Sequence, residues 1–166
     1  EILEKRGIKD FNIWYGGPAG LGLSKVDEGI SQIVRERGTK LNTVKLAGEI
    51  KRSELQGFLG KMKIGIMPSV FREPMGLVAL EMMAAGIPVI AYDYGGPSET
   101  IVNGQTGFLV ENKRPDLLAE RIEWFLDNRK AIAEMGKNAR KHVVDNYSLE
   151  KHGRGLQHIY EMIKNE

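Results

Sequence analysis

The sequence contains no cysteine and no long apolar run. Without cysteine, a disulfide framework, a cysteine-based zinc site and a thiol nucleophile are excluded. No apolar segment approaches the roughly 20 residues that a membrane-spanning helix needs, and residues 1–10 lack the apolar core of a signal peptide. The 24 basic and 22 acidic side chains nearly balance, which argues against a protein that binds mainly to nucleic-acid phosphates.

Glycine, in contrast, is abundant, with 20 residues in a chain of 166. The glycines gather beside short apolar runs that are typical of buried strands. These runs predict strands at residues 11–15, 43–48, 63–67, 88–92 and 107–110. Helical patterns lie between them, one capped by Ser24, one capped by Ser53 and one at 77–85. The alternation predicts an α/β fold, a mostly parallel, Rossmann-like sheet flanked by helices.

The chain after residue 110 has helical patterns throughout. Pro115 stands where a first helical turn begins, and Ser148 is a candidate cap for the last helix. That last helix carries Leu149, Leu156, Ile159, Tyr160 and Ile163 on one face. We find no repeat and no linker, so we expect residues 1–166 to form a single domain.

The segment 68–86 is the most informative one for function. It predicts a strand end, a loop with Glu73, and a helix that begins near Gly76 and carries Glu81. A helix N-terminus binds phosphate through its free amides and partial positive charge, and carboxylates accept hydrogen bonds from sugar hydroxyls. Spacing alone leaves open the alternative that Glu73 only caps the helix and Glu81 is solvated or ion-paired.

Two further glycine segments are weaker signals. Residues 95–110 are explained either as tight turns or as a segment whose amides at 95–97 line the floor of a ligand crevice. Residues 16–22 fit neither the dinucleotide-binding pattern nor the P-loop. The three histidines are not spaced as a metal-binding pair, so no metal site is expected.

The run P-S-x-x-x-E-P-M-G-L-V-A-L-E at residues 68–81 contains an E-x7-E motif, followed by G-G-P-S-E-T at 95–100. Together with M-G-K-N-A-R at 135–140, it strongly resembles the carboxy-terminal, donor-binding domain of retaining GT-B glycosyltransferases, glycosyltransferase family 4 (glycosyl transferases group 1). The resemblance extends from about residue 11 to about residue 163.

The resemblance implies a nucleotide-sugar donor, a UDP-, GDP- or ADP-sugar, with no metal and no further cofactor required. It implies that Glu81 holds the ribose hydroxyls and that Glu73, the catalytic residue of the motif, contacts the donor sugar. Ile50 is placed against the base. The implied donor-binding residues are Ile50, Glu73, Pro74, Met75, Gly76, Leu77, Val78 and Glu81.

The sequence lacks two features of the complete family protein: an N-terminal acceptor domain, and a first strand with a G-R…K-G stretch that neutralises the diphosphate. We therefore expect a fragment of a larger retaining hexosyltransferase, inactive in isolation. The acceptor, a glycan, a lipid or a small molecule, would bind through the missing domain. A cytoplasmic location is expected, with any peripheral membrane contact made by that domain. The alternatives are a stand-alone nucleotide-sugar-binding or regulatory module, and a GT-B sugar-phosphate synthase or phosphorylase.

Overall fold

The computed structural model describes residues 2–7, 11–16 and 44–164. The chain divides into two compact units, Glu1–Phe58 and Leu59–Glu166. The helix expected after Ser24 and all but the first residue of the 16–22 glycine segment lie outside the described residues. The expected single nucleotide-sugar-binding domain over residues 1–166 stays a prediction.

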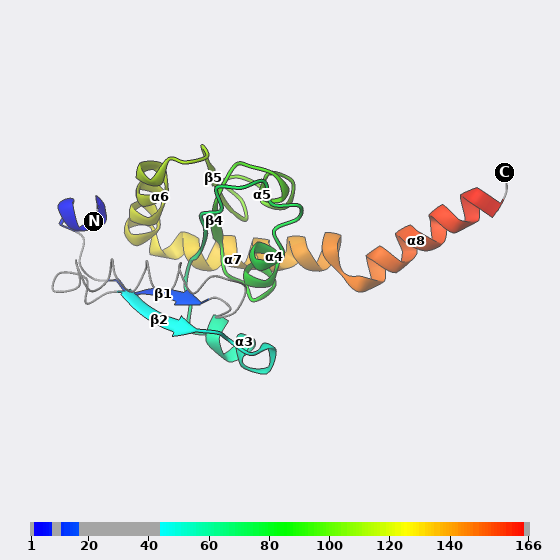
Figure 1. The fold of residues 1–166 in the computed structure, drawn as a ribbon, viewed down its shortest axis with the longest axis horizontal. Helices are drawn as coiled ribbons and strands as arrows, with labels where there is room; N and C mark the ends of the chain where they lie inside the picture. The colour runs from blue at the N-terminus through cyan, green and yellow to red at the C-terminus, as the bar shows by residue number, and fades with distance from the viewer. Residues whose placement is uncertain (1, 8–10, 17–43, 165–166) are drawn as a thin grey trace. The chain divides into compact units, whose positions relative to one another are not determined.

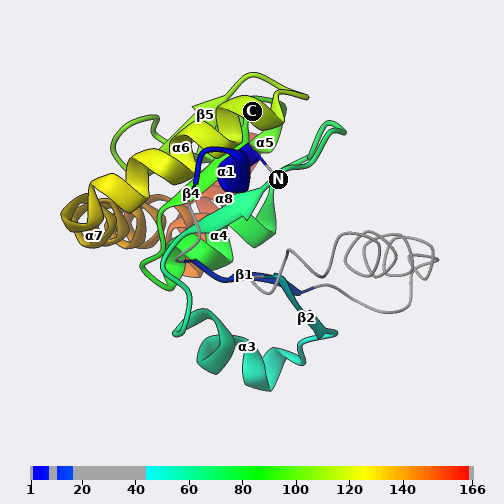
Figure 2. The same ribbon diagram turned by 90° about the vertical axis from the view of Figure 1, so that its left-hand side faces the viewer.

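The first unit is built around two parallel strands. They lie side by side (Figures 1 and 2), and their register places Trp14 opposite Lys45. The Lys45 ammonium lies 5.0 Å from the centre of the Trp14 ring, a distance suited to a cation–π interaction. The elements are α1 (Ile2–Lys5), β1 (Ile13–Gly16), β2 (Val44–Gly48) and α3 (Arg52–Leu59), whose last residue falls in the second unit. Both predicted strands and the predicted helix are confirmed, but the helix begins at Arg52, so Ser53 is its second residue and not its cap.

The second unit contains a three-stranded parallel sheet in the order β3-β4-β5. All four residues of the central strand, β4, are buried and apolar in character, as expected of a strand that is covered on both faces. Each parallel step needs a crossover, which α4 and α5 supply. The elements are β3 (Gly65–Met67), α4 (Leu77–Ala84), β4 (Val89–Tyr92), α5 (Gly96–Thr100), β5 (Gly107–Val110), α6 (Pro115–Asp127), α7 (Arg129–Tyr147) and α8 (Leu149–Lys164).

The core of this unit forms between the sheet and the helices α6 and α7. Phe125 of α6 is completely buried, and its ring centre lies 5.3 Å from that of Phe108 on β5 and 5.4 Å from that of Trp124. Such tilted and edge-on ring pairs add to the gain from apolar burial. The buried members of the cluster are Ile90, Tyr92, Phe108, Val110, Leu118, Phe125 and Met135.

Two residues of the M-G-K-N-A-R segment attach α7 to the end of α4. The Arg140 guanidinium donates a hydrogen bond of 2.5 Å to the Ala84 carbonyl, one of the acceptors left open where a helix ends. Gly136 lies so close to the Gly86 carbonyl that a Cβ at this position would clash with it. This packing explains why a glycine and an arginine occur four residues apart on one face of α7.

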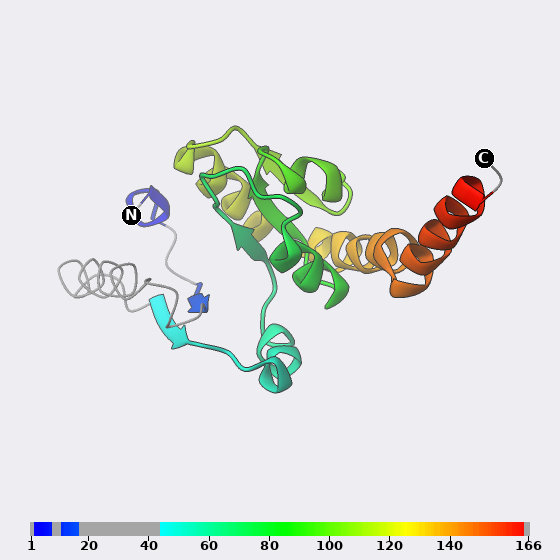
Figure 3. The ribbon, with the colours of Figure 1, turned by 45° about the vertical axis from the view of Figure 1, so that its right-hand side comes forward.

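The last helix, α8, has no buried residue. It continues from α7 away from the three-stranded sheet of its own unit (Figure 3), and the predicted Ser148 cap is confirmed, because the Lys151 amide donates to the Ser148 hydroxyl at 3.3 Å. The predicted apolar face is present but exposed, from 43% at Leu156 to 90% at Leu149. Among the described residues, no helix combines the length and the apolar character that crossing a membrane requires.

We expect Phe125→Ala to lower the free energy of unfolding by about 3–5 kcal/mol, because it removes a fully buried ring and leaves a cavity. Leu149→Ala, at 90% exposure, is the matched control and should change stability by less than about 0.5 kcal/mol. Denaturant unfolding can be followed through Trp124 in a Trp14→Phe background, which removes the other tryptophan. Similar midpoints for the two variants would contradict this description of the core.

We expect Gly136→Ala to destabilise the second unit by about 1–3 kcal/mol, because the added methyl group meets the Gly86 carbonyl. Gly153→Ala makes the same chemical change in α8, where a Cβ meets nothing within 4 Å. There the higher helix propensity of alanine should leave stability unchanged or raised. Thermal unfolding of both variants checks the prediction, and a stable Gly136→Ala variant would show that α7 does not touch the Gly86 turn.

Candidate functional site

The candidate site is built on the loop that follows β3, at the carboxyl end of the parallel sheet. This edge is where ligands bind in open α/β sheets. The loop, residues 68–76, meets the turn that follows the neighbouring strand β4. Glu73 pairs with Gly95 in an isolated parallel bridge, and the Gly96 amide donates a hydrogen bond of 2.7 Å to the Glu73 carbonyl. The main chain of Glu73 is therefore fixed by a second loop.

Glycine at positions 95 and 96 makes this contact possible. A Cβ on Gly95 would lie 2.5 Å from the Glu73 carbonyl oxygen, and one on Gly96 would collide with the backbone of Met75. Gly95 also has a φ of 78°, which side chains disfavour. The interpretation that the amides of 95–97 line a crevice floor needs correction at Gly96, because that amide is bonded to Glu73, and at Pro97, which has no amide hydrogen. Residues 95 and 96 therefore hold the loop that carries Glu73 in place.

The Glu73 carboxylate is half-buried and has a defined partner. The Ser69 hydroxyl donates a hydrogen bond of 2.8 Å to Glu73 Oε1. Glu73 does not cap the following helix, because the N-cap residue of α4 is Gly76 and no side chain caps it. The alternative role of Glu73 as a helix cap is therefore excluded. Sequence reasoning gave Ser69 no role, although it stands in the quoted motif.

The N-terminus of α4 presents backbone amides among exposed apolar side chains. Gly76 adopts the left-handed conformation with a φ of 75°, and its carbonyl accepts hydrogen bonds from Ala79 and Leu80. Within the described part of the chain, the amides of Leu77 and Val78 donate to no backbone carbonyl. These two side chains are 64% and 58% exposed. The arrangement leaves donors open for an anion where the helix dipole is positive.

Glu81 lies on the same side of α4 as these exposed residues, because it follows Leu77 by four positions and Val78 by three. It is half-buried, and both its neighbours in sequence, Leu80 and Met82, are buried. The structure thus places Glu73 on the loop that leads into α4 and Glu81 on the helix itself, as the sequence predicted. Their roles as ligand-binding carboxylates stay predictions.

Seven of the eight predicted donor-binding residues are brought together in this way, on one continuous stretch. They are Glu73, Pro74, Met75, Gly76, Leu77, Val78 and Glu81. Ile50 is in the loop between β2 and α3 of the first unit, and its Cδ1 atom fills the space beside Gly16, 2.6 Å from where a Cβ on that glycine would stand. Its contact with a base stays a prediction.

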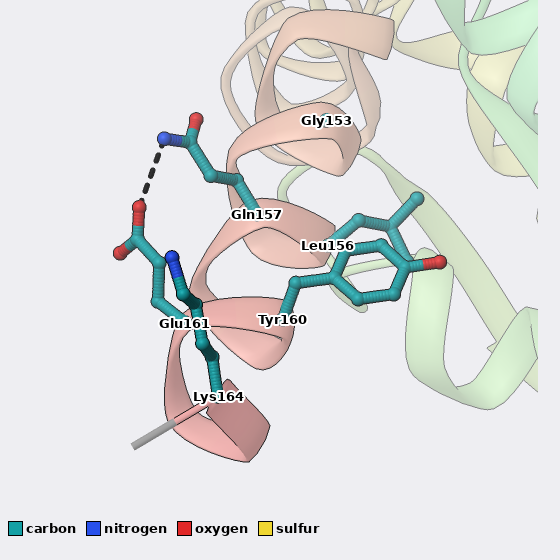
Figure 4. A pocket seen from close by; sticks show the side chains of 6 residues that line it. All are labelled: Gly153, Leu156, Gln157, Tyr160, Glu161 and Lys164. Atoms are coloured by element: carbon teal, nitrogen blue, oxygen red, sulfur yellow. Dashed lines mark hydrogen bonds between the residues drawn. The ribbon is translucent and has the colours of Figure 1, made fainter.

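The structure also contains a surface hollow along α8 (Figure 4). Leu156 and Tyr160 lie side by side in it, and the Gln157 amide donates a hydrogen bond of 2.9 Å to Glu161. None of the predicted donor-binding residues lines it. The lining residues are Gly153, Leu156, Gln157, Tyr160, Glu161 and Lys164.

Known proteins share both the sequence and the fold. The profile of the family described as Glycosyl transferases group 1 matches residues 23–142, more than two thirds of the chain. D-inositol 3-phosphate glycosyltransferase of Streptomyces avermitilis is 35% identical over 127 residues, which are 76% of this chain and 27% of that protein. The chain therefore spans about a quarter of that relative's length.

Two solved structures are similar along nearly the whole chain. Sucrose-phosphate synthase of Thermosynechococcus elongatus gives a TM-score of 0.85 at 26% identity, covering 99% of this chain and 41% of that one. A mutant of TarM from S. aureus, in complex with UDP, Fondaparinux and alpha-GlcNAc-glycerol, gives 0.72 at 26% identity, covering 90% and 28%. The expected α/β fold, as in GT-B glycosyltransferases, is confirmed, and the chain belongs to the glycosyl transferases group 1 family.

Proposed function

We propose that this chain binds a nucleotide-diphosphate sugar and serves as the donor-binding part of a larger, retaining glycosyltransferase. The observation that supports the proposal is the start of α4, where a left-handed Gly76 and no side-chain cap precede the amides of Leu77 and Val78, with Glu73 in the loop before it and Glu81 one turn into the helix. An anionic diphosphate suits the amides, and two carboxylates suit hydroxyl groups on either side of it. The membership of the glycosyl transferases group 1 family supports the same reading.

In this proposal each part of the site has a separate task. Glu81 accepts hydrogen bonds from the ribose hydroxyls, and Glu73 orients the sugar. The amides around Gly76, Leu77 and Val78 stabilise the negative charge that develops on the diphosphate as it leaves, which is the electrostatic contribution expected of preorganised donors. Pro74 and Met75 complete the loop, and Ile50 contacts the base. Retention of configuration at the anomeric carbon follows from the family resemblance.

UDP is the first candidate among UDP, GDP and ADP, because TarM, at 26% identity, has been solved with UDP. A related sugar-phosphate synthase is the second candidate function, favoured by the TM-score of 0.85 with sucrose-phosphate synthase. Product analysis with the complete enzyme separates the two, since a synthase transfers the sugar to a phosphorylated acceptor. The acceptor-binding domain and the cytoplasmic location stay predictions.

We expect Glu81→Ala to weaken UDP binding by roughly 1.5–3 kcal/mol, the range for a hydrogen bond to a charged group, or about 10- to 150-fold. Glu134→Ala is the matched control, since it removes an exposed carboxylate from α7. Isothermal titration of the chain with UDP, GDP and ADP measures both variants and identifies the base. Equal affinity of wild type and Glu81→Ala for the preferred nucleotide would argue against a ribose-binding role.

We expect the 166-residue chain to transfer no sugar on its own, because it spans about a quarter of the length of the related inositol-phosphate glycosyltransferase and the proposal places the acceptor-binding groups in the remainder of such an enzyme. Incubation with UDP-sugars and a panel of glycan, lipid and small-molecule acceptors should release no UDP above the uncatalysed rate. Sugar transfer that disappears in Glu73→Ala would contradict this expectation and show that the chain is a complete catalyst.

A further inference from the structure

Ser69 stands two residues beyond the end of β3, in the loop that carries Glu73. Its hydroxyl donates to Glu73 Oε1 at 2.8 Å, a length typical of a well-formed bond between a hydroxyl and a carboxylate. Ser69 is half-buried, so its position is fixed by the loop more firmly than that of a fully exposed side chain. The bond spans four residues in a segment that is not helical.

The main chain of Glu73 is already fixed from the other side. Its carbonyl accepts the Gly96 amide at 2.7 Å, and the residue forms a bridge with Gly95. What remains free is rotation about the side-chain bonds of Glu73, a long side chain that has much rotamer freedom to lose on binding. The Ser69 hydroxyl holds one carboxylate oxygen and thereby restricts this rotation. From the part of the chain that the structure describes, no hydrogen bond is found to the other oxygen, Oε2.

We propose that Ser69 is a positioning residue that preorganises the Glu73 carboxylate for the hydroxyl groups of the donor sugar. The proposal rests on the function proposed above, in which Glu73 contacts the sugar and Glu81 contacts the nucleotide. A carboxylate that is ordered before binding gains more from the same hydrogen bonds, since its rotamer freedom is not lost at that moment. Ser69 acts only through Glu73 and does not itself touch the donor.

This role differs measurably from simple stabilisation of the loop. If the serine only kept the loop folded, its loss would disturb the amides at 75–78 and would weaken the nucleotide diphosphate and the nucleotide sugar alike. If it positions Glu73, its loss weakens binding of the sugar portion and spares the diphosphate. The informative quantity is therefore the ratio of the affinity for the nucleotide sugar to the affinity for the free nucleoside diphosphate.

The test is isothermal titration of the whole chain with UDP, GDP and ADP and with UDP-glucose, UDP-N-acetylglucosamine, GDP-mannose and ADP-glucose. For the best-bound pair, Ser69→Ala should lower the affinity ratio by about 2- to 10-fold, the usual effect of ordering one flexible side chain. Affinity for the diphosphate should stay within about twofold. Ser69→Thr keeps the hydroxyl and should restore the ratio, and Ser148→Ala, a serine that caps α8, should leave it unchanged.

A double-mutant cycle completes the test. In a Glu73→Ala background, the further change Ser69→Ala should have no effect on the ratio, because the group that it positions is gone. An unchanged ratio in Ser69→Ala, an equal loss for diphosphate and nucleotide sugar, or an effect that persists without Glu73 would overturn the proposal while leaving the donor site intact. If the wild-type chain binds none of the three diphosphates, the proposed function itself fails, and the role of Ser69 fails with it.

Discussion

The hydrogen bond from the Gly96 amide to the Glu73 carbonyl joins the two loops on which the candidate site depends. One loop follows β3 and the other follows β4. Because these strands are parallel, both loops begin at the same edge of the sheet. The contact exists only because residues 95 and 96 have no side chain. Because the main chain of Glu73 is held in this way, the direction of its carboxylate depends on rotation about the Glu73 side-chain bonds and on the hydrogen bond from Ser69.

Helix α4, whose N-terminus forms part of the candidate site, is held in place at both of its ends. At its start, a Cβ on Gly76 would lie 3.2 Å from the Met67 side chain, so the turn fits closely against β3. At its other end, the Ala84 carbonyl accepts a hydrogen bond from the Arg140 guanidinium. The turn that follows, at Gly86, packs on Gly136 of α7. Helix α7 therefore contributes to the position of the open amides although it supplies none of the predicted ligand contacts.

Much of this arrangement could be predicted from local sequence. The apolar runs identify all five described strands. The reason is clearest for β4, which is buried along its whole length and so has no polar alternation, whereas β1 alternates half-buried and exposed residues. The cap at Ser148 also follows from a side chain that acts on neighbouring backbone. The E-x7-E spacing places Glu81 on the open side of α4, since helical periodicity is fixed.

The roles of Gly95 and Gly96 could not be predicted in the same way. They depend on how closely two loops approach, and these loops follow strands more than twenty residues apart in the chain. The bond from Ser69 to Glu73 forms within one loop, but it depends on an irregular backbone path that no sequence period fixes. A glycine that avoids a collision has the same sequence signature as a glycine that exposes its amide to a ligand. The crevice-floor interpretation failed at Gly96 for this reason, since tertiary contact alone decides which of the two applies.

The side chains of Met75, Leu77 and Val78 are all at least 45% exposed at the mouth of the candidate site. They are attached to a backbone that the glycines of the next loop hold in place, so the fold places few demands on their size or shape. In the proposed function, the scaffold and the selectivity for the sugar are therefore encoded at different positions. A lineage of such proteins could exchange one sugar for another by altering these three side chains, without rebuilding the loop that carries them.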